Sequence, residues 1–282
     1  MEKLIDMHIH TVYSDGEKTP CEIVEMVKEN NVSTFSITDH DTVLGVKDLY
    51  ENYHDNDLRF IPGIELTGKI DKGRLHILGY GIDPYNNKLS EMLTGLRESS
   101  IQRVIAMVDY IKTRFNIAFS DTDLEKMYSA VGNIGRPDIA KLCLKYGYVS
   151  NTQEAFNKYL IEAYDHLRKG SLKLSDKDCI SLILESGGIP VLAHPISLEK
   201  DYYELDSYIE KLTQYGLAGI EVYHSLQSDQ YSKQLLSLVD KYNLLVSGGS
   251  DYHGEIIKPD VMIGSGRNNN IKIKHLSILN KL

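Results

Sequence analysis

The chain of 282 residues has no uninterrupted apolar stretch near the ~18 residues that a membrane-spanning helix needs. Its first residues, MEKLIDMHIH, contain neither an apolar core of signal-peptide length nor a small-residue cleavage site. Cysteine is scarce, and Cys21, Cys143 and Cys179 lie far apart without a CxxC pair. This pattern excludes a disulfide framework and a cysteine zinc site. We therefore expect a cytoplasmic protein with buried, reduced thiols and no membrane partner.

Positive charge is also in deficit, because 40 acidic residues outnumber 31 lysines and arginines and leave a net charge of -9. This balance opposes binding to long nucleic acids, whose protein partners gain affinity by displacing counterions with a basic face. A small or short anionic substrate is compatible with the composition if the positive charge is local. Bound divalent metals would supply such a charge.

Short apolar runs alternate with amphipathic helical patterns along most of the chain. The helical patterns include PCEIVEMVKENN, which follows a candidate cap at Thr19, and two further segments at 203–216 and 228–243. The alternation predicts an α/β fold with a largely parallel sheet, and seven strands suit a closed barrel. The seven apolar runs are 3–10, 33–41, 59–66, 74–81, 188–195, 218–224 and 244–253.

The alternation stops between residues 88 and 177, where helical segments follow one another without a convincing strand. A helical insertion between the fourth and fifth strands is the simplest explanation. We therefore predict a barrel domain formed by residues 1–87 and 178–282, with a helical insertion at 88–177. The length of the chain is compatible with one barrel or two domains.

Histidine and carboxylate side chains stand at the ends of these runs, beginning with the HxH pair of His8 and His10. A lone histidine at a strand end is more often a solvated side chain than a ligand, but here separate segments each contribute a candidate. In a barrel of parallel strands these ends converge on one face. The donor set suits zinc, manganese or iron, and its size implies two or three divalent ions. The candidate ligands are His8, His10, Asp15, His40, Glu65, His76, His194, Asp251 and His253, and Asp39 and Asp41 stand beside His40 at the end of the second run.

Seven ordered segments resemble the polymerase and histidinol phosphatase (PHP) superfamily of metal-dependent phosphoesterases. They are DMHIHTVYSDG, ITDHDT, PGIE, HILGY, GGIPVLAHP, GIEVYH and GGSDYHG. The insertion, which contains GRPDIAK, is similar to the group of nucleoside 3',5'-bisphosphate phosphatases and 5'-to-3' oligoribonucleases. This resemblance implies a distorted (β/α)7 barrel, the PHP fold, with a trinuclear metal site.

The resemblance also implies a role for each candidate residue. His8, His10 and Asp251 would hold the first ion, with Glu65 bridging to the third, which His76 and His194 complete; Asp15, His40 and His253 would hold the second. Arg136 would bind a substrate phosphate, and Lys158 is a second candidate for substrate contact. His224 is a candidate proton donor or a histidine without such a role. Asp138 stands where many members have histidine, and we expect His54, His166 and His275 at the surface.

The reaction implied by the resemblance is attack of a metal-bound hydroxide on phosphorus. The expected partner is a small phosphorylated substrate, either a 3',5'-bisphosphate nucleotide such as pAp or a short 5'-phosphorylated RNA. The alternatives are a histidinol-phosphate phosphatase and an inactive metal-binding regulatory module. An amidohydrolase also uses HxH on a barrel strand, but Glu65 takes the place of the carboxylated lysine usual there.

Overall fold

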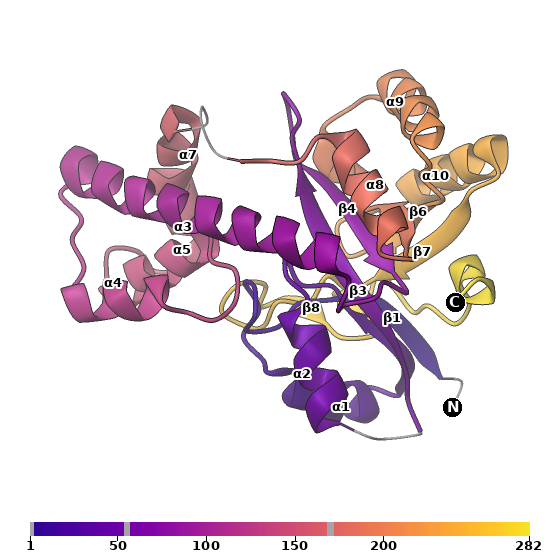
Figure 1. The fold of residues 1–282 in the computed structure, drawn as a ribbon, viewed down its shortest axis with the longest axis horizontal. Helices are drawn as coiled ribbons and strands as arrows, with labels where there is room; N and C mark the ends of the chain where they lie inside the picture. Colours follow the sequence, from indigo (N-terminus) through magenta and orange to yellow (C-terminus); the bar gives the residue numbers. More distant parts are fainter. Residues whose placement is uncertain (1–2, 54–56, 168–171) are drawn as a thin grey trace.

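The computed structural model describes residues 3–53, 57–167 and 172–282, and one seven-stranded sheet forms its centre (Figure 1). The strands lie in the sheet in the same order as in the chain. Each predicted apolar run forms one strand. The strands are β1 (Leu4–Ile9), β2 (Val32–Ile37), β3 (Arg59–Gly68), β4 (Leu75–Tyr80), β5 (Ile189–Leu192), β6 (Gly219–His224) and β7 (Leu245–Gly249).

The strand β4 runs antiparallel to both of its neighbours, β3 and β5. The other four neighbouring pairs are parallel. Only residues 69–74 separate β3 from β4, and a parallel crossover needs about a dozen residues or more. The short connection therefore imposes an antiparallel return. The predicted parallel sheet is correct for most pairs and wrong at the fourth strand.

The sheet curls into a nearly closed barrel because β7 returns to β1. The backbone N–H of Asp251 donates to the carbonyl of His8 at 2.8 Å, and Ile9 forms an isolated parallel bridge with Tyr252. A Cβ atom on Gly249 would lie 2.4 Å from the backbone nitrogen of His8. Glycine at this position therefore permits the close approach that brings the two strand ends together.

Helices cover the outer face of the barrel on both sides (Figure 1). The first of them begins after Thr19, whose hydroxyl accepts from the backbone N–H of Glu22 while the Glu22 carboxylate accepts from the N–H of Thr19. This capping box confirms the predicted helix start. The covering helices are α1 (Pro20–Glu29), α2 (Leu44–Asn52), α8 (Asp176–Glu185), α9 (Tyr202–Gln214) and α10 (Asp229–Tyr242).

A second group of helices lies between β4 and α8 and has a hydrophobic core of its own. Its longest helix, α3, extends from the barrel to the far end of this group (Figure 1). Leu89 and Leu93 of α3 pack into the barrel core, whereas Val104 and Met107 pack into the second core. The helices are α3 (Asn87–Phe115), α4 (Asp121–Tyr128), α5 (Arg136–Lys145), α6 (Thr152–Ala155), the π-helical turn η1 (Phe156–Leu160) and α7 (Ile161–Leu167).

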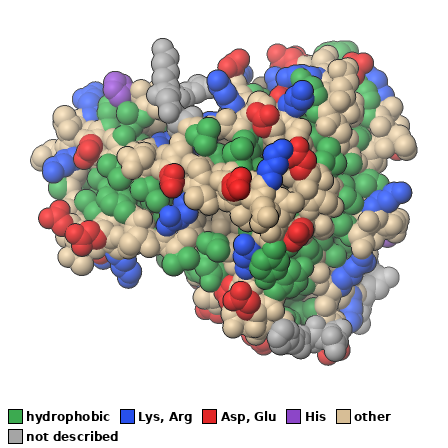
Figure 2. All heavy atoms as spheres, viewed as in Figure 1, with side chains coloured by type: hydrophobic (Ala, Val, Ile, Leu, Met, Phe, Trp, Pro, Cys, Tyr) green, Lys and Arg blue, Asp and Glu red, His purple; other side chains and the backbone are tan. Residues whose placement is uncertain are grey.

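The remaining elements are short and lie after β5 and β7. They are the 3-10 turns η2 (Pro195–Leu198) and η3 (Ser277–Asn280) and the hairpin of β8 (Val261–Met262) and β9 (Gly266–Arg267). No helix among the described residues is long and apolar enough to cross a bilayer. Acidic and basic side chains are interspersed on the face in Figure 2.

The three cysteines are free thiols, as predicted. Cys143 and Cys179 are buried in the two hydrophobic cores, but Cys21 is exposed. The expectation of a buried thiol is therefore wrong for Cys21, because the buried face of α1 is formed by Pro20, Ile23, Val24 and Val27.

Candidate metal centre

The HxH pair of β1 places two imidazoles side by side in the barrel. His8 and His10 have no exposed surface, and their Nε2 atoms lie 3.1 Å apart. Residues i and i+2 of a strand share one face, which explains this convergence. The pair therefore points into the interior, as its spacing predicts.

Glu65, a fully buried residue of β3, lies at the centre of the cluster. Its Oε2 atom is 3.1 Å from Nε2 of His8 and 3.2 Å from Nε2 of His10. Its Oε1 atom is 2.8 Å from Nδ1 of His76 and 2.8 Å from Nε2 of His194. One carboxylate thus contacts four histidines that lie in or just beyond the strands β1, β4 and β5.

Asp15 contacts a second set of imidazoles on one side of the cluster. Its Oδ1 atom lies 3.2 Å from Nε2 of His253 and 3.6 Å from Nδ1 of His10. His40 contacts both carboxylates. Its Nδ1 atom is 3.2 Å from Glu65 Oε2, and its Nε2 atom is 3.9 Å from Asp15 Oδ2. His40 and His10 therefore join this group to the one around Glu65.

Asp251 follows β7 and closes the other side of the cluster. Its Oδ1 atom lies 3.3 Å from Nε2 of His10 and 3.5 Å from Nε2 of His8. Its Oδ2 atom lies 2.5 Å from Nζ of Lys258 and 3.1 Å from Nε2 of His224. The backbone φ angle of Asp251 is +57°, a left-handed conformation that is uncommon outside glycine and clusters at functional sites.

His76 reaches the cluster because β4 is antiparallel. It is the second residue of β4, so it lies at the start of its strand, whereas the other ligand candidates lie in or beyond the later part of theirs. The reversed direction brings this start to the same end of the barrel. Nδ1 of His76 is 3.2 Å from Nε2 of His194, which follows β5.

The carboxylates of the cluster remain ionised despite their burial. Burial alone would raise the pKa of Glu65, but His40, His76 and His8 hold it well below its usual range. Burial is likewise outweighed at Asp15, where His253 and His40 lower the pKa, and at Asp251, where Lys258 and His253 lower it. Metal ligation needs such deprotonated carboxylates.

The pKa values of the buried imidazoles shift in different directions. Burial lowers the pKa of His76 to about 3 and that of His253 to about 4. Burial also acts to lower the pKa of His10, but hydrogen bonds to Asp251 and Glu65 raise it to about 9. A cation among these carboxylates would compete with the proton on His10, so metal binding and protonation are linked here.

The residues present fit divalent metal ions. Two imidazole nitrogens at 3.1 Å, as in His8 and His10, share at most one proton, and a cation would give both lone pairs a partner. Three further groups of histidine and carboxylate ligand atoms lie within 4.8 Å of one another. Nitrogen and oxygen donors without thiolate suit zinc, manganese or iron. Eight of the nine ligand candidates from the sequence belong to these groups, and the ninth, His194, lies 2.8 Å from Glu65.

The substrate-binding candidates lie in the helical region. Arg136 begins α5, and its guanidinium carbon is 4.3 Å from the ring centre of Tyr164. Burial lowers the pKa of Arg136, and the nearby Arg74 and Arg103 lower it further. Lys158 instead lies in η1 with half its side chain exposed, and its Nζ is 2.5 Å from Glu154. The structure thus places Arg136 in a basic setting and Lys158 in a surface ion pair.

His224 ends β6 and is almost fully buried. Its Nδ1 accepts from the backbone N–H of Leu226 at 3.1 Å, so its Nε2 carries the proton toward Asp251. Its role as a proton donor stays a prediction. Of the histidines expected at the surface, His166 and His275 are exposed and His54 lies outside the described residues.

Two charged residues that contact ligand candidates were not predicted from the sequence: Glu221 contacts His8 and His194, and Lys258 contacts Asp251. Asp39, at the end of the second apolar run, accepts hydrogen bonds from Thr11 and Ser14 in the loop before Asp15. The signal that could have found Glu221 is a lone carboxylate inside the apolar strand GIEVYH. A buried charge in such a strand requires a partner.

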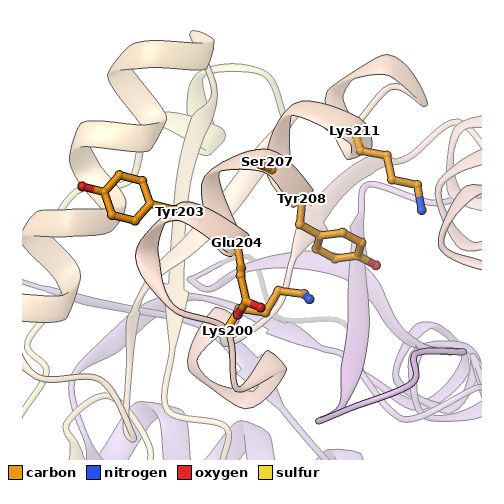
Figure 3. A pocket seen from close by; sticks show the side chains of 6 residues that line it. All are labelled: Lys200, Tyr203, Glu204, Ser207, Tyr208 and Lys211. Atoms are coloured by element: carbon orange, nitrogen blue, oxygen red, sulfur yellow. The ribbon is translucent and has the colours of Figure 1, made fainter.

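A shallow hollow lies on the outer surface along α9, away from this cluster (Figure 3). It contains none of the site residues predicted from the sequence. Lys200 and Lys211 lie over the ring of Tyr208, and Lys211 also pairs with Asp176. These contacts satisfy the basic side chains, so the hollow offers no comparable site. Its lining residues are Lys200, Tyr203, Glu204, Ser207, Tyr208 and Lys211.

Three characterised proteins are similar to this chain over most of their lengths. The phosphoribosyl 1,2-cyclic phosphate 1,2-diphosphodiesterase of Eggerthella lenta is 29% identical, covering 89% of this chain and 94% of its own. The 3',5'-nucleoside bisphosphate phosphatase of Chromobacterium violaceum is 27% identical, covering 88% and 87%. The 5'-3' exoribonuclease Rnm of Escherichia coli is 28% identical, covering 89% and 85%.

The fold is similar to a solved structure as well. The crystal structure of a protein from Bifidobacterium adolescentis, assigned as a metal-dependent phosphoesterase, aligns with a TM-score of 0.83 and 28% identity. The alignment covers 94% of this chain and 92% of that one. The similarity therefore includes the helices inserted between β4 and α8.

A nearly closed seven-stranded barrel with histidines and carboxylates at one end defines a metal-dependent phosphoesterase. Residues 6–258 match the PHP domain family, which is most of the chain. The chain belongs to this family and is a hydrolase of phosphoesters, as the motifs predicted.

Proposed function

We propose that the protein removes phosphate from 3',5'-bisphosphate nucleotides such as pAp, or releases nucleotides from short 5'-phosphorylated RNA. The observation that carries this proposal is the position of α5, which begins at Arg136, beside the loops that bear Asp15 and His40. A substrate phosphate at the metal centre and a second phosphate at Arg136 would then belong to one small molecule. The bisphosphate phosphatase and the exoribonuclease among the similar proteins support this class of substrate.

Three metal positions are consistent with the contacts described above. We assign the first ion to His8, His10 and Asp251, and the second to Asp15, His40 and His253. We assign the third to His76 and His194, with Glu65 shared between the first and third. Bound divalent ions would activate a water molecule and neutralise phosphate charge in the transition state. The carboxylates, ionised despite burial, and the neutral His76 and His253 supply the ligand states that binding requires.

We assign residues 88–177 to a lid that binds the rest of the substrate, and residues 1–87 and 178–282 to the barrel domain. The lid contacts two ligand-bearing loops directly. The side-chain amide of Asn133 donates to the carbonyl of His40 at 3.2 Å, and Nζ of Lys141 lies 3.3 Å from the carbonyl of Asp15. A Cβ atom on Gly132 would lie 2.1 Å from the carbonyl of Tyr13, so glycine permits this contact.

Arg136 is suited to hold a substrate phosphate. Its guanidinium lies over the ring of Tyr164, an arrangement that leaves the N–H groups at the edge of the guanidinium plane free to bind an anion. Arg103 of α3 is close enough to lower the pKa of Arg136, and among the described residues no carboxylate forms an ion pair with either arginine. An anionic group would relieve the repulsion between the two cations and pair with the planar fork.

The test is a comparison of kcat/KM for purified protein supplied with Mn²⁺ on six compounds. They are adenosine 3',5'-bisphosphate, AMP, a 5'-phosphorylated dinucleotide, histidinol phosphate, phosphoribosyl 1,2-cyclic phosphate and p-nitrophenyl phosphate. The proposal requires highest efficiency on the bisphosphate or the dinucleotide. A preference for histidinol phosphate or the cyclic phosphate would replace it, and Asp251→Ala protein prepared identically controls for contaminating phosphatases.

A further inference from the structure

Glu221 joins two ligand candidates that we assign to different ions. It lies on β6 with no exposed surface. Its Oε1 atom is 2.8 Å from Nδ1 of His8, and its Oε2 atom accepts the backbone N–H of His194 at 2.7 Å. Both carboxylate oxygens are therefore engaged by donors from two other elements of the barrel, β1 and the end of β5.

The contact with Glu221 fixes which nitrogen of His8 is available to a metal. A carboxylate accepts hydrogen bonds and does not donate them, so Nδ1 of His8 must carry a proton. In the neutral ring the lone pair is then on Nε2. This is the atom that lies 3.1 Å from Nε2 of His10 and 3.1 Å from Glu65. The Glu221 contact thus directs the donor lone pair of His8 into the cluster.

The contact with His194 acts on the backbone. His194 has a φ angle of +22° and a ψ angle of 68°, an unusual conformation for a side chain with a Cβ atom. Its imidazole Nε2 nevertheless lies 2.8 Å from Glu65 Oε1. The hydrogen bond from its amide to Glu221 holds this conformation in place. The same carboxylate therefore orients one ring directly and another through the main chain.

We propose that Glu221 is a positioning residue that couples the first and third metal positions, by fixing the ring tautomer of His8 and the backbone of His194. This inference rests on the ligand assignment in the proposed function and adds a residue outside that set. Partners of this kind affect metal affinity by about 10- to 100-fold. Loss of Glu221 should therefore weaken two ions together, although the nine ligands are unchanged.

The substitution Glu221→Gln gives a sharp test because it keeps the shape and changes the hydrogen-bonding pattern. A glutamine has one acceptor oxygen, whereas His8 Nδ1–H and the His194 amide are both donors. If the amide NH2 faces His8, it forces the proton to Nε2 and removes the donor lone pair. If the NH2 faces His194, two donors meet there. Either orientation breaks one of the two hydrogen bonds, and the other loses the negative charge of its acceptor, so both ligand candidates are disturbed.

Asp6→Asn is the matched control. Asp6 is equally buried, and its oxygens accept from the backbone N–H groups of Ser250, Gly264 and, more distantly, His8, without contacting an imidazole nitrogen. Its loss removes a buried charge and backbone hydrogen bonds but leaves the His8 tautomer unchanged. A loss of stability common to both variants therefore reflects the loss of a buried carboxylate. A loss of Zn²⁺ affinity found only in Glu221→Gln reflects the positioning of His8 and His194.

Zn²⁺ binding is measured by equilibrium dialysis with elemental analysis, without substrate, for wild type and both variants. We expect Glu221→Gln to bind Zn²⁺ at least about 10-fold more weakly at two positions, and Asp6→Asn to keep the wild-type stoichiometry. Wild-type affinity and stoichiometry in Glu221→Gln would overturn the inference, as would loss of one ion alone. Because this measurement contains no substrate, its result does not depend on whether the proposed phosphatase reaction occurs, which the comparison of six compounds tests.

A second measurement applies if Glu221→Gln does not fold. Histidine ¹⁵N spectra of the Zn²⁺-loaded wild-type protein report which ring nitrogen of His8 carries the proton. We expect a protonated Nδ1 and a metal-bound Nε2. A His8 ring bound through Nδ1, or wild-type protein that binds no Zn²⁺, would overturn the proposal.

Discussion

Glu65 and His76 are diagonal neighbours across the antiparallel pair of β3 and β4, with Oε1 of the carboxylate 2.8 Å from Nδ1 of the imidazole. The other oxygen of Glu65 faces His8 and His10. A single carboxylate therefore reaches two of the assigned metal positions, and neutralising it should affect both.

We expect Glu65→Gln to bind at least one metal ion fewer than wild type, because the substitution removes the charge shared by two metal positions. We also expect its kcat/KM to fall by about two orders of magnitude or more. Elemental analysis and turnover measured on the same preparations test this. Glu255→Gln, which changes an exposed carboxylate near the end of β7, serves as the control. Full metal content with full activity in Glu65→Gln would reject the bridging role.

Alanine substitutions of His40 and Asp251 should abolish turnover while the fold persists. Both residues lie beyond strand ends, whereas the hydrophobic core lies below them among the strands and outer helices. Circular dichroism and thermal unfolding separate loss of activity from loss of structure, because metal ligands can also contribute to stability. His275→Ala, at an exposed histidine outside the cluster, controls for the loss of an imidazole. Activity near wild type in either variant would place the reaction elsewhere.

The strands and ligand candidates could be predicted because each apolar run carries its own local signal. The direction of β4 was a different matter, since it depends on the length of the connection 69–74 rather than on the strand itself. That length is visible in the sequence, and the rule that parallel crossovers need more residues would have predicted the antiparallel return. His76 lies beside Glu65 and His194 although its strand is antiparallel to its neighbours, and its role as a ligand stays a prediction.

Contacts between distant segments could not be read from any local pattern. Arg103 and Arg136 lie on different helices, so their proximity depends on how α3 and α5 pack. The partners of Glu221, His8 and His194, lie on other strands, so the sequence of β6 alone does not indicate these contacts. Lys158, in contrast, has Glu154 four residues before it in a helical segment, and this spacing alone favours the ion pair that the structure contains.

Asp138 should give the metal-free protein a pH-dependent stability. Burial raises the pKa of its carboxyl from 3.8 to about 6. The folded state therefore holds this proton more tightly than the unfolded chain, and stability falls as pH rises from about 4 to about 6. At about 1.4 kcal/mol for each pH unit, the effect is on the order of 3 kcal/mol.

Asp138→Asn removes this titration and keeps an oxygen that can accept the backbone N–H of Gly135. We expect the free energy of unfolding of the variant, minus that of wild type, to increase between pH 4 and pH 7. Urea denaturation with a chelator present measures it without a contribution from metal binding. Parallel stability curves for the two proteins would contradict the expected shift.

Arg136→Ala should discriminate among substrates rather than slow all of them. A charge-assisted hydrogen bond contributes roughly 1.5 to 3 kcal/mol, so kcat/KM on adenosine 3',5'-bisphosphate should fall by about one to two orders of magnitude. Hydrolysis of p-nitrophenyl phosphate, which has no second phosphate, should change little. Lys158→Ala removes the same charge from a half-exposed residue paired with Glu154, and it tests the second contact expected from the sequence. Equal losses on both substrates in Arg136→Ala would exclude a role in binding the second phosphate, because an effect on the metal centre would not distinguish them.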